Sequence, residues 1–213
     1  MVNIRLPLSL RQVEDLLHER GIDICHETVC VWWNRFAPIF AAEIRRSRST
    51  SMRADIQWGW HLDEVLVRIN GEIHCLWRAV DHNGEVLEFL VTKKRDRKAA
   101  PRFLRRTKKR YGRPRAIVTD RLRSYGMAMK VIGNAAVYEC GRWLNNRAEN
   151  SHQPFRRRER AMAKFRGVKT LQKFAAIHAS IHNHFNQGRH LNRRDIFKKK
   201  RSAALAEWRQ LAA

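Results

Sequence analysis

The sequence predicts an α/β fold, in which a mixed five-stranded sheet is flanked by helices and preceded by a small helical segment. Three observations support this prediction. A block of alternating apolar and polar residues contains two Asn-Gly turns, two shorter apolar runs follow it, and patterns of helical period separate and follow these runs. The 213 residues are enough for one such domain and a smaller second one.

Residues 1–44 are predicted to form two helices. Apolar residues recur at helical spacing over residues 9–19, and Gly21 ends this helix. A second helix is expected over about 26–36, ending at Pro38. Such a pair is typical of a helix-turn-helix, although an ordinary helical hairpin fits the pattern equally well. In a helix-turn-helix the second helix would enter the DNA major groove, and its candidate contacts are His26, Thr28 and Asn34.

The next segment, residues 45–56, is basic and lacks periodicity, so a basic linker is expected there. Beyond it the period changes to two. Asn70-Gly71 and Asn83-Gly84 are strong hairpin signals. The expected antiparallel strands are 59–69, 72–80 and 86–92.

The remaining elements complete the sheet. A basic helix ending at Gly112 precedes a short strand in RPRAIVTDR, a helix, and a strand in AAVYEC. The sequence then has helical character over 145–188, and residues 191–213 form a basic tail with a short amphipathic helix. The order of three strands, helix, strand, helix, strand and helices is that of an RNase H-like core, which we assign to residues 57–190.

The charge of the chain indicates its partner. It carries 44 Lys and Arg against 20 Asp and Glu, a formal charge of +24. Self-repulsion of this size favours a polyanionic partner, with nucleic acid as the first candidate and an anionic membrane surface as the second. No apolar stretch is long enough to span a bilayer, and the N-terminus does not resemble a secretory signal. We therefore expect a cytoplasmic protein on the bacterial nucleoid, without a membrane partner or a small-molecule substrate.

Three carboxylates stand at informative places in the predicted core. Asp63 lies in the first strand, Asp120 ends the fourth, and Glu149 begins a helix among arginines. The first and fourth strands of an RNase H-like sheet are neighbours, so these acids can converge. Hard Mg²⁺ ions prefer such oxygen ligands, and two of them can promote displacement at phosphorus. Each acid could instead be a surface or capping residue, and alternation alone does not choose between Asp63 and Glu64.

Three long motifs carry a family resemblance. WHLDEVLVRINGEIHCLWRAVD, VTDRLRSY and NNRAENSHQPFRRRER resemble the transposases of the sixth bacterial insertion-sequence family, which are DDE enzymes with an RNase H-like fold. The resemblance covers about residues 8–209. It implies binding to terminal inverted repeats and target DNA, probable partners for a homo-oligomer assembled on DNA, and Mg²⁺-dependent strand transfer in which Mn²⁺ can substitute. It also implies replicative, cointegrate-type movement.

The same resemblance assigns the site residues. It places the catalytic, metal-binding acids at Asp63, Asp120 and Glu149, and a phosphate-orienting residue at Arg156, seven positions after Glu149. Further DNA contacts are expected from Arg147, Arg157 and Arg158. Family members usually carry an additional helix before LSLRQVE, so we expect an N-terminally incomplete helix-turn-helix. The alternative function is that of a truncated, catalytically inert copy acting only as a DNA-binding protein or repressor.

Overall fold

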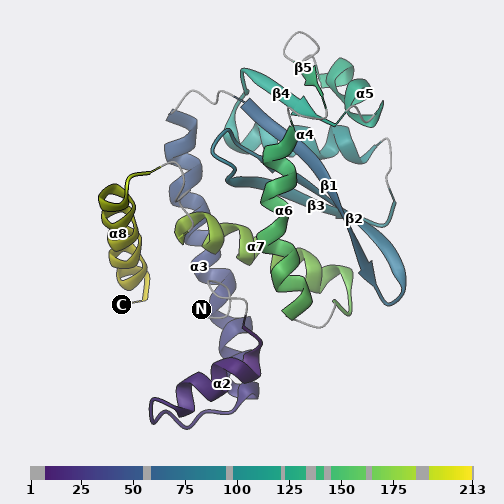
Figure 1. Ribbon diagram of the computed structural model, residues 1–213. Coiled ribbons are helices and arrows are strands. Elements are labelled where there is room, and N and C mark those ends of the chain that lie inside the picture. The colour runs from purple at the N-terminus through teal and green to yellow at the C-terminus, as the bar shows by residue number, and fades with distance from the viewer. Residues whose placement is uncertain are drawn as a thin grey trace. The chain divides into compact units, whose positions relative to one another are not determined.

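The computed structural model describes residues 8–54, 59–94, 98–120, 123–132, 138–141, 145–161, 165–185 and 192–212 (Figure 1). The chain divides into two compact units. One is Arg46–Ala175, which contains the sheet, and the other combines Met1–Arg45 with Ala176–Ala213.

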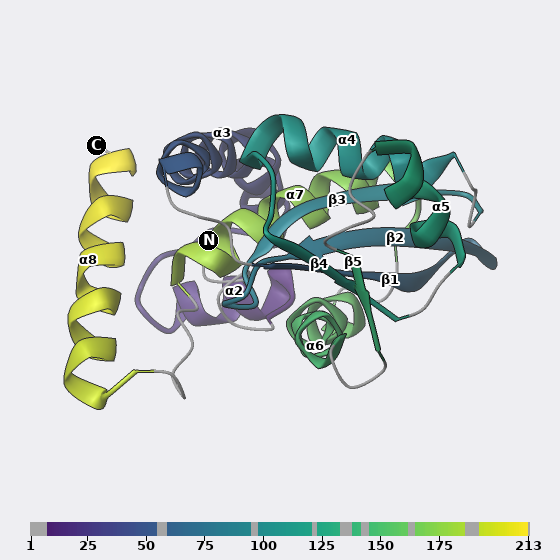
Figure 2. The same ribbon diagram turned by 90° about the horizontal axis from the view of Figure 1, so that it is seen from above.

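The first of these units has the predicted RNase H-like architecture. Its five strands lie in the order β3-β2-β1-β4-β5, with β1, β2 and β3 antiparallel and β4 and β5 parallel to β1. The strands are β1 Gly59–Ile69, β2 Glu72–Val80, β3 Val86–Thr92, β4 Ala116–Thr119 and β5 Tyr138–Cys140. The helices are α4 Ala99–Tyr111, α5 Arg123–Ile132 and α6 Asn146–Ala161. Figure 2 shows α4 and α5 on one face of the sheet and α6 on the other.

The hairpin between β1 and β2 follows its predicted turn chemistry. Asn70 and Gly71 have φ angles of 49° and 84°, and a tight two-residue hairpin needs positive φ at both central positions. The turn sets the register in which Asp63 faces Arg78 across the ladder and Glu64 faces Trp77. The positions of Asp63 and Glu64 on the sheet therefore follow directly from the local sequence.

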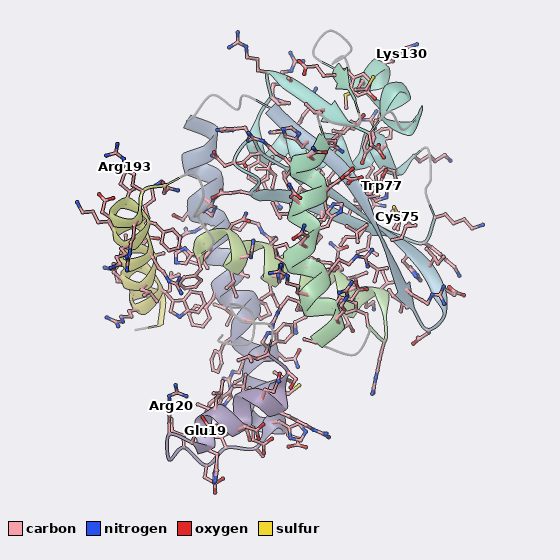
Figure 3. All side chains as sticks on the ribbon, viewed as in Figure 1. Glu19, Arg20, Cys75, Trp77, Lys130 and Arg193 are labelled. Atoms are coloured by element: carbon pink, nitrogen blue, oxygen red, sulfur yellow. The ribbon has the colours of Figure 1, made fainter. Side chains whose placement is uncertain are left out.

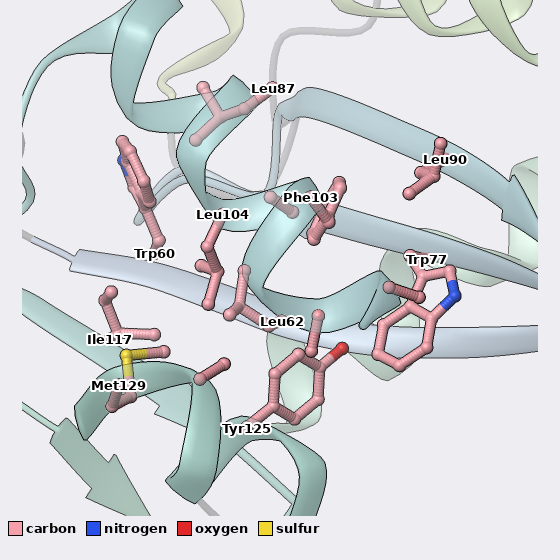
Figure 4. Packing of buried hydrophobic residues seen from close by; sticks show 14 of the residues in the cluster. Trp60, Leu62, Trp77, Leu87, Leu90, Phe103, Leu104, Ile117, Tyr125 and Met129 are labelled. Atoms are coloured by element: carbon pink, nitrogen blue, oxygen red, sulfur yellow. The ribbon is translucent and has the colours of Figure 1, made fainter. Parts of the chain in front are cut away.

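The main hydrophobic core lies between the sheet and α4 and α5 (Figure 4). Trp60 and Leu62 of β1 point into it, as do Trp77 of β2 and Tyr125 of α5, and all four are fully buried. Trp77 meets the Tyr125 ring edge-on at 5.6 Å, a geometry that adds about 0.5–1.5 kcal/mol to the burial energy. On β2, Cys75 and Trp77 share this core, whereas Lys130 of α5 is exposed (Figure 3).

The opposite face of the sheet is covered by α6, through an aromatic cluster. Phe155 of α6 stacks on Phe165 at 6.2 Å and packs against Phe174 at 5.9 Å. The guanidinium of Arg78 lies 5.9 Å from the centre of the Phe155 ring. Because α6 buries Phe155 over β2, its N-terminal turn is directed along β1.

The second unit is helical. The predicted capping box is present at α2 Leu10–His18, where Ser9 and Gln12 exchange backbone hydrogen bonds. The next helix, α3 His26–Ala54, contradicts the prediction that Pro38 ends it, and it turns residues 45–54 of the expected linker into helix. Its buried stripe of Ala37, Ala41 and Ile44 explains the difference, because burial of this stripe offsets the backbone hydrogen bond that a proline removes.

Two further helices complete this unit. They are α7 Val168–Phe185, whose C-terminal part belongs here, and α8 Arg194–Ala212. Ile177 and Ile181 of α7 pack on the buried stripe of α3, and Trp208 of α8 packs against Phe40 and Phe185. The tail is thus one helix from Arg194 onward, rather than a basic segment followed by a short helix. No helix in the described ranges combines the length and apolar character that a bilayer crossing requires.

Candidate active site

Strand register brings Asp63 and Asp120 together. The parallel pairing of β1 with β4 ends where His61 lies beside Val118. Two residues further along each chain are Asp63, still within β1, and Asp120, directly after β4. Carboxylates separated by 57 positions in the sequence therefore meet at the carboxyl end of a short parallel strand.

A third carboxylate, Glu64, belongs to the same group. One ligand oxygen from each of Asp63, Glu64 and Asp120 lies within 4.8 Å of the others. Asp63 and Glu64 are 9% and 8% exposed, and Asp63 Oδ1 accepts a hydrogen bond from the Glu64 backbone N–H at 2.8 Å. Asp120 Oδ1 is also buried and accepts no hydrogen bond from the described residues. A cluster of buried hard oxygens is the donor set that Mg²⁺ prefers, so these residues fit a divalent metal.

The electrostatic surroundings keep this cluster anionic. Arg78, the cross-strand neighbour of Asp63, is buried, and this burial lowers its pKa to about 10, so it stays charged at neutral pH. His152 Nε2 lies 3.7 Å from Asp63 Oδ2. Burial, Arg78 and Arg156 lower the pKa of His152 to about 3, so the ring is neutral and the contact is not an ion pair. Asp63 is therefore balanced by one permanent cation.

Two side-chain hydrogen bonds hold α6 alongside β1. The buried Asn145, directly before α6, donates from Nδ2 to the Leu62 carbonyl at 2.9 Å. Arg156 donates to the Leu66 carbonyl at 2.6 Å. Glu149 lies between these anchors on the first turn of α6, exposed, and is not among the carboxylates that meet within 4.8 Å in the described part of the chain.

The arginines predicted around Glu149 have different surroundings. Arg147 and Arg157 are exposed on α6. Arg156 also pairs with Glu159 at 2.6 Å, so its guanidinium connects α6 to β1. Arg158 is only 3% exposed, because it follows Phe155 by three positions and shares its buried face. This burial runs against its predicted contact with DNA.

The three N-terminal candidates all lie on α3. His26 is its first residue, with Nδ1 3.0 Å from a Glu14 carboxylate oxygen and Nε2 3.1 Å from one of Glu27. The Thr28 hydroxyl lies 3.3 Å from the Cys25 sulfur. Asn34 donates to the Cys30 carbonyl at 3.0 Å. Their local bonds stabilise the helix and its start, and their contacts with DNA remain a prediction.

Sequence reasoning named Glu64 but did not include it in the site. Alternation places neighbouring residues on opposite faces, so it suggests that only one of Asp63 and Glu64 can face a ligand. The missing information was the end of the β1–β4 pairing, which leaves this edge of β1 open beyond His61. The short length of the apolar run AIVT before Asp120 is the only sequence signal that could have indicated it.

Comparisons with known proteins agree with this site. Residues 57–188 match the family model described as the DDE domain, of IS240-type transposases. The transposase of the IS431mec element of Staphylococcus aureus is 30% identical over 155 residues, which cover 70% of this chain and 67% of that protein. The Staphylococcus aureus IS257 transposase in transposon Tn4003 matches with the same identity and coverage.

Similarity to solved structures is more distant. The catalytic core of the HTLV-2 integrase, solved in complex with magnesium, is 13% identical with a TM-score of 0.43, covering 61% of this chain and 86% of that one. The simian T-cell lymphotropic virus intasome gives a TM-score of 0.42 at 14% identity, covering 64% of this chain and 53% of that one. At these scores the fold assignment depends on the strand order instead.

Proposed function

The chain belongs to the DDE transposases of the sixth insertion-sequence family, and from this premise we propose that Asp63, Asp120 and Glu149 hold the divalent metal used in its chemistry on DNA. A DDE transposase is a polynucleotidyl transferase. The observation that carries the proposal is the meeting of Asp63 and Asp120 at the end of β4, inside the matched domain. The alternative of an inert DNA-binding copy is not favoured.

The residues divide the task by position. Asp63 would contact both of two Mg²⁺ ions, with Mn²⁺ as a substitute, while Asp120 and Glu149 would contact one each. Bound there, the metal would activate the attacking oxygen and stabilise the leaving one. The neutral His152 and the charged Arg78 flank Asp63 and keep its carboxylate ionised and oriented. Arg156, which is 37% exposed in its side chain, would steady a phosphate beside Glu149.

The DNA substrates follow from the family. Water would first cleave at the terminal inverted repeats, and the freed 3′-hydroxyl would then attack target DNA, in replicative, cointegrate-type movement. The formal charge of +24 supports DNA as the partner, and we place the protein on the bacterial nucleoid as a homo-oligomer assembled on DNA. His26, Thr28, Asn34, Arg147 and Arg157 are the proposed DNA contacts.

The test is strand transfer by the purified full chain on DNA that carries the ends of its element, with Mg²⁺ or Mn²⁺. We expect Asp63→Asn to reduce the rate by at least about a thousandfold, because an amide cannot supply the lost anionic oxygen. Asp195→Asn, on exposed α8, is the charge-matched control and should retain activity. Equal activity of wild type and Asp63→Asn would refute the assignment.

A further inference from the structure

We infer that Glu64 is a fourth metal-binding carboxylate of this site, reaching it from the opposite face of the sheet, with Tyr125 as the residue that positions it. The inference rests on the proposed function, because it adds a ligand to the metal assigned to Asp63, Asp120 and Glu149. Those three residues follow from the family pattern, whereas Glu64 follows from the geometry of this chain.

The first step is how Glu64 reaches the group. Its even-numbered neighbours Trp60 and Leu62 point into the core beneath α4 and α5, while Asp63 points toward α6. Carboxylates on opposite faces meet only if they bend around a strand edge. The β1–β4 pairing ends at His61, so the edge at Asp63 and Glu64 is open, and both side chains lie within 4.8 Å of Asp120 there.

The second step is charge. Asp63 has Arg78 as its ladder partner, whereas Glu64 has Trp77, which supplies no positive charge. Glu64 is nevertheless buried at 8% exposure beside two other carboxylates. Burying a carboxylate is costly unless a cation compensates it, and a shared divalent ion would compensate all three.

The third step is the independent evidence from Tyr125. This residue is fully buried on α5, and its hydroxyl receives no hydrogen bond of good geometry from the described residues. Burial raises its pKa well above the ordinary value, and so do the carboxylates of Glu64, Asp63 and Asp120. A neutral phenol beside the acids can donate a proton to a Glu64 oxygen and leave the other oxygen for a ligand.

The experiment is a titration of the purified full chain with Mn²⁺ alone, followed by electron paramagnetic resonance of the free ion. We expect Glu64→Gln, which keeps the side-chain shape, to weaken Mn²⁺ binding by at least about tenfold. Tyr125→Phe should weaken it less, and the exposed Glu139→Gln on β5 should leave it unchanged. Circular dichroism and melting without metal establish that each variant is folded.

The outcomes separate the two proposals. Wild type that binds no Mn²⁺ would overturn the proposed function. Wild type that binds Mn²⁺ while Glu64→Gln binds it equally well would overturn only the role of Glu64, even if that variant melts at a different temperature. If Glu64→Gln does not fold, Glu64→Asp shortens the side chain by one methylene, and unchanged affinity in that variant would also overturn the inference.

Discussion

The hydrogen bond from Asn145 to Leu62 gives a quantitative prediction, because it fixes the start of the helix that carries Glu149. The donor and acceptor are 2.9 Å apart, and both residues are fully buried. The strand pairing of β1 with β4 ends at His61, so the Asn145 amide supplies a donor just where the ladder stops. Asn145→Ala removes it and leaves a buried carbonyl without that partner.

An unsatisfied buried acceptor costs about 1–3 kcal/mol, so we expect the free energy of unfolding to fall by about 2 kcal/mol. For a chain of this size that corresponds to a Tm lower by roughly 4–8 °C. Strand transfer should fall more than stability does, because the first turn of α6 loses its anchor beside Asp63. Urea unfolding followed by circular dichroism, together with the transfer assay at a temperature where the variant is folded, measures both effects.

The matched control is Asn150→Ala, an exposed asparagine on the same helix turn as Glu149. Replacing it leaves no buried group unsatisfied, and its unfolding free energy should stay within about 0.5 kcal/mol of wild type. If Asn145→Ala were as stable and as active as this control, the anchoring argument would be refuted.

Two further predictions concern stability. Pro38→Ala should raise the free energy of unfolding by about 1–2 kcal/mol, because it restores an interior hydrogen bond of α3, and urea unfolding checks this; a less stable variant would mean that the proline ring contributes more by packing. Asp81→Asn should stabilise the protein at pH 7. Burial raises the pKa of Asp81, so the stability of its protonated form is present below the ordinary carboxyl pKa and is lost as the pH rises through the raised value. Asparagine can still accept the N–H groups of Asn83 and Glu85, so the advantage of the variant should shrink toward zero near pH 3, and a gain independent of pH would contradict the argument.

The sheet could be predicted from the sequence because its signals are local. Alternation and the Asn70-Gly71 turn set the boundaries of β1 and β2, and the observed strands match the expected ranges. The neighbouring positions of Asp63 and Asp120 also followed, because an RNase H-like order makes β1 and β4 adjacent. These inferences needed only the period of the pattern and the chain order.

The rest depended on packing that a local pattern does not contain. Pro38 is a strong stop signal, yet the buried contacts of Ala37 and Ala41 with α7 carry the helix through it. Arg158 is one arginine among several in the sequence, and only the placement of Phe155 shows that it is buried. Glu64 needed the point at which β4 stops pairing, which lies 57 positions from it along the chain at Asp120, less one.

The boundary between the two units falls inside α3 and α7 rather than in a loop, at Arg45 and Ala176. A shortened version of this protein that kept only residues 57–190 would therefore retain Ile177 and Ile181 without the Ala41 and Ile44 side chains that cover them. Those bare isoleucines would make the isolated fragment sticky in solution. Crystallisation or domain-swap experiments would do better to retain both helices whole.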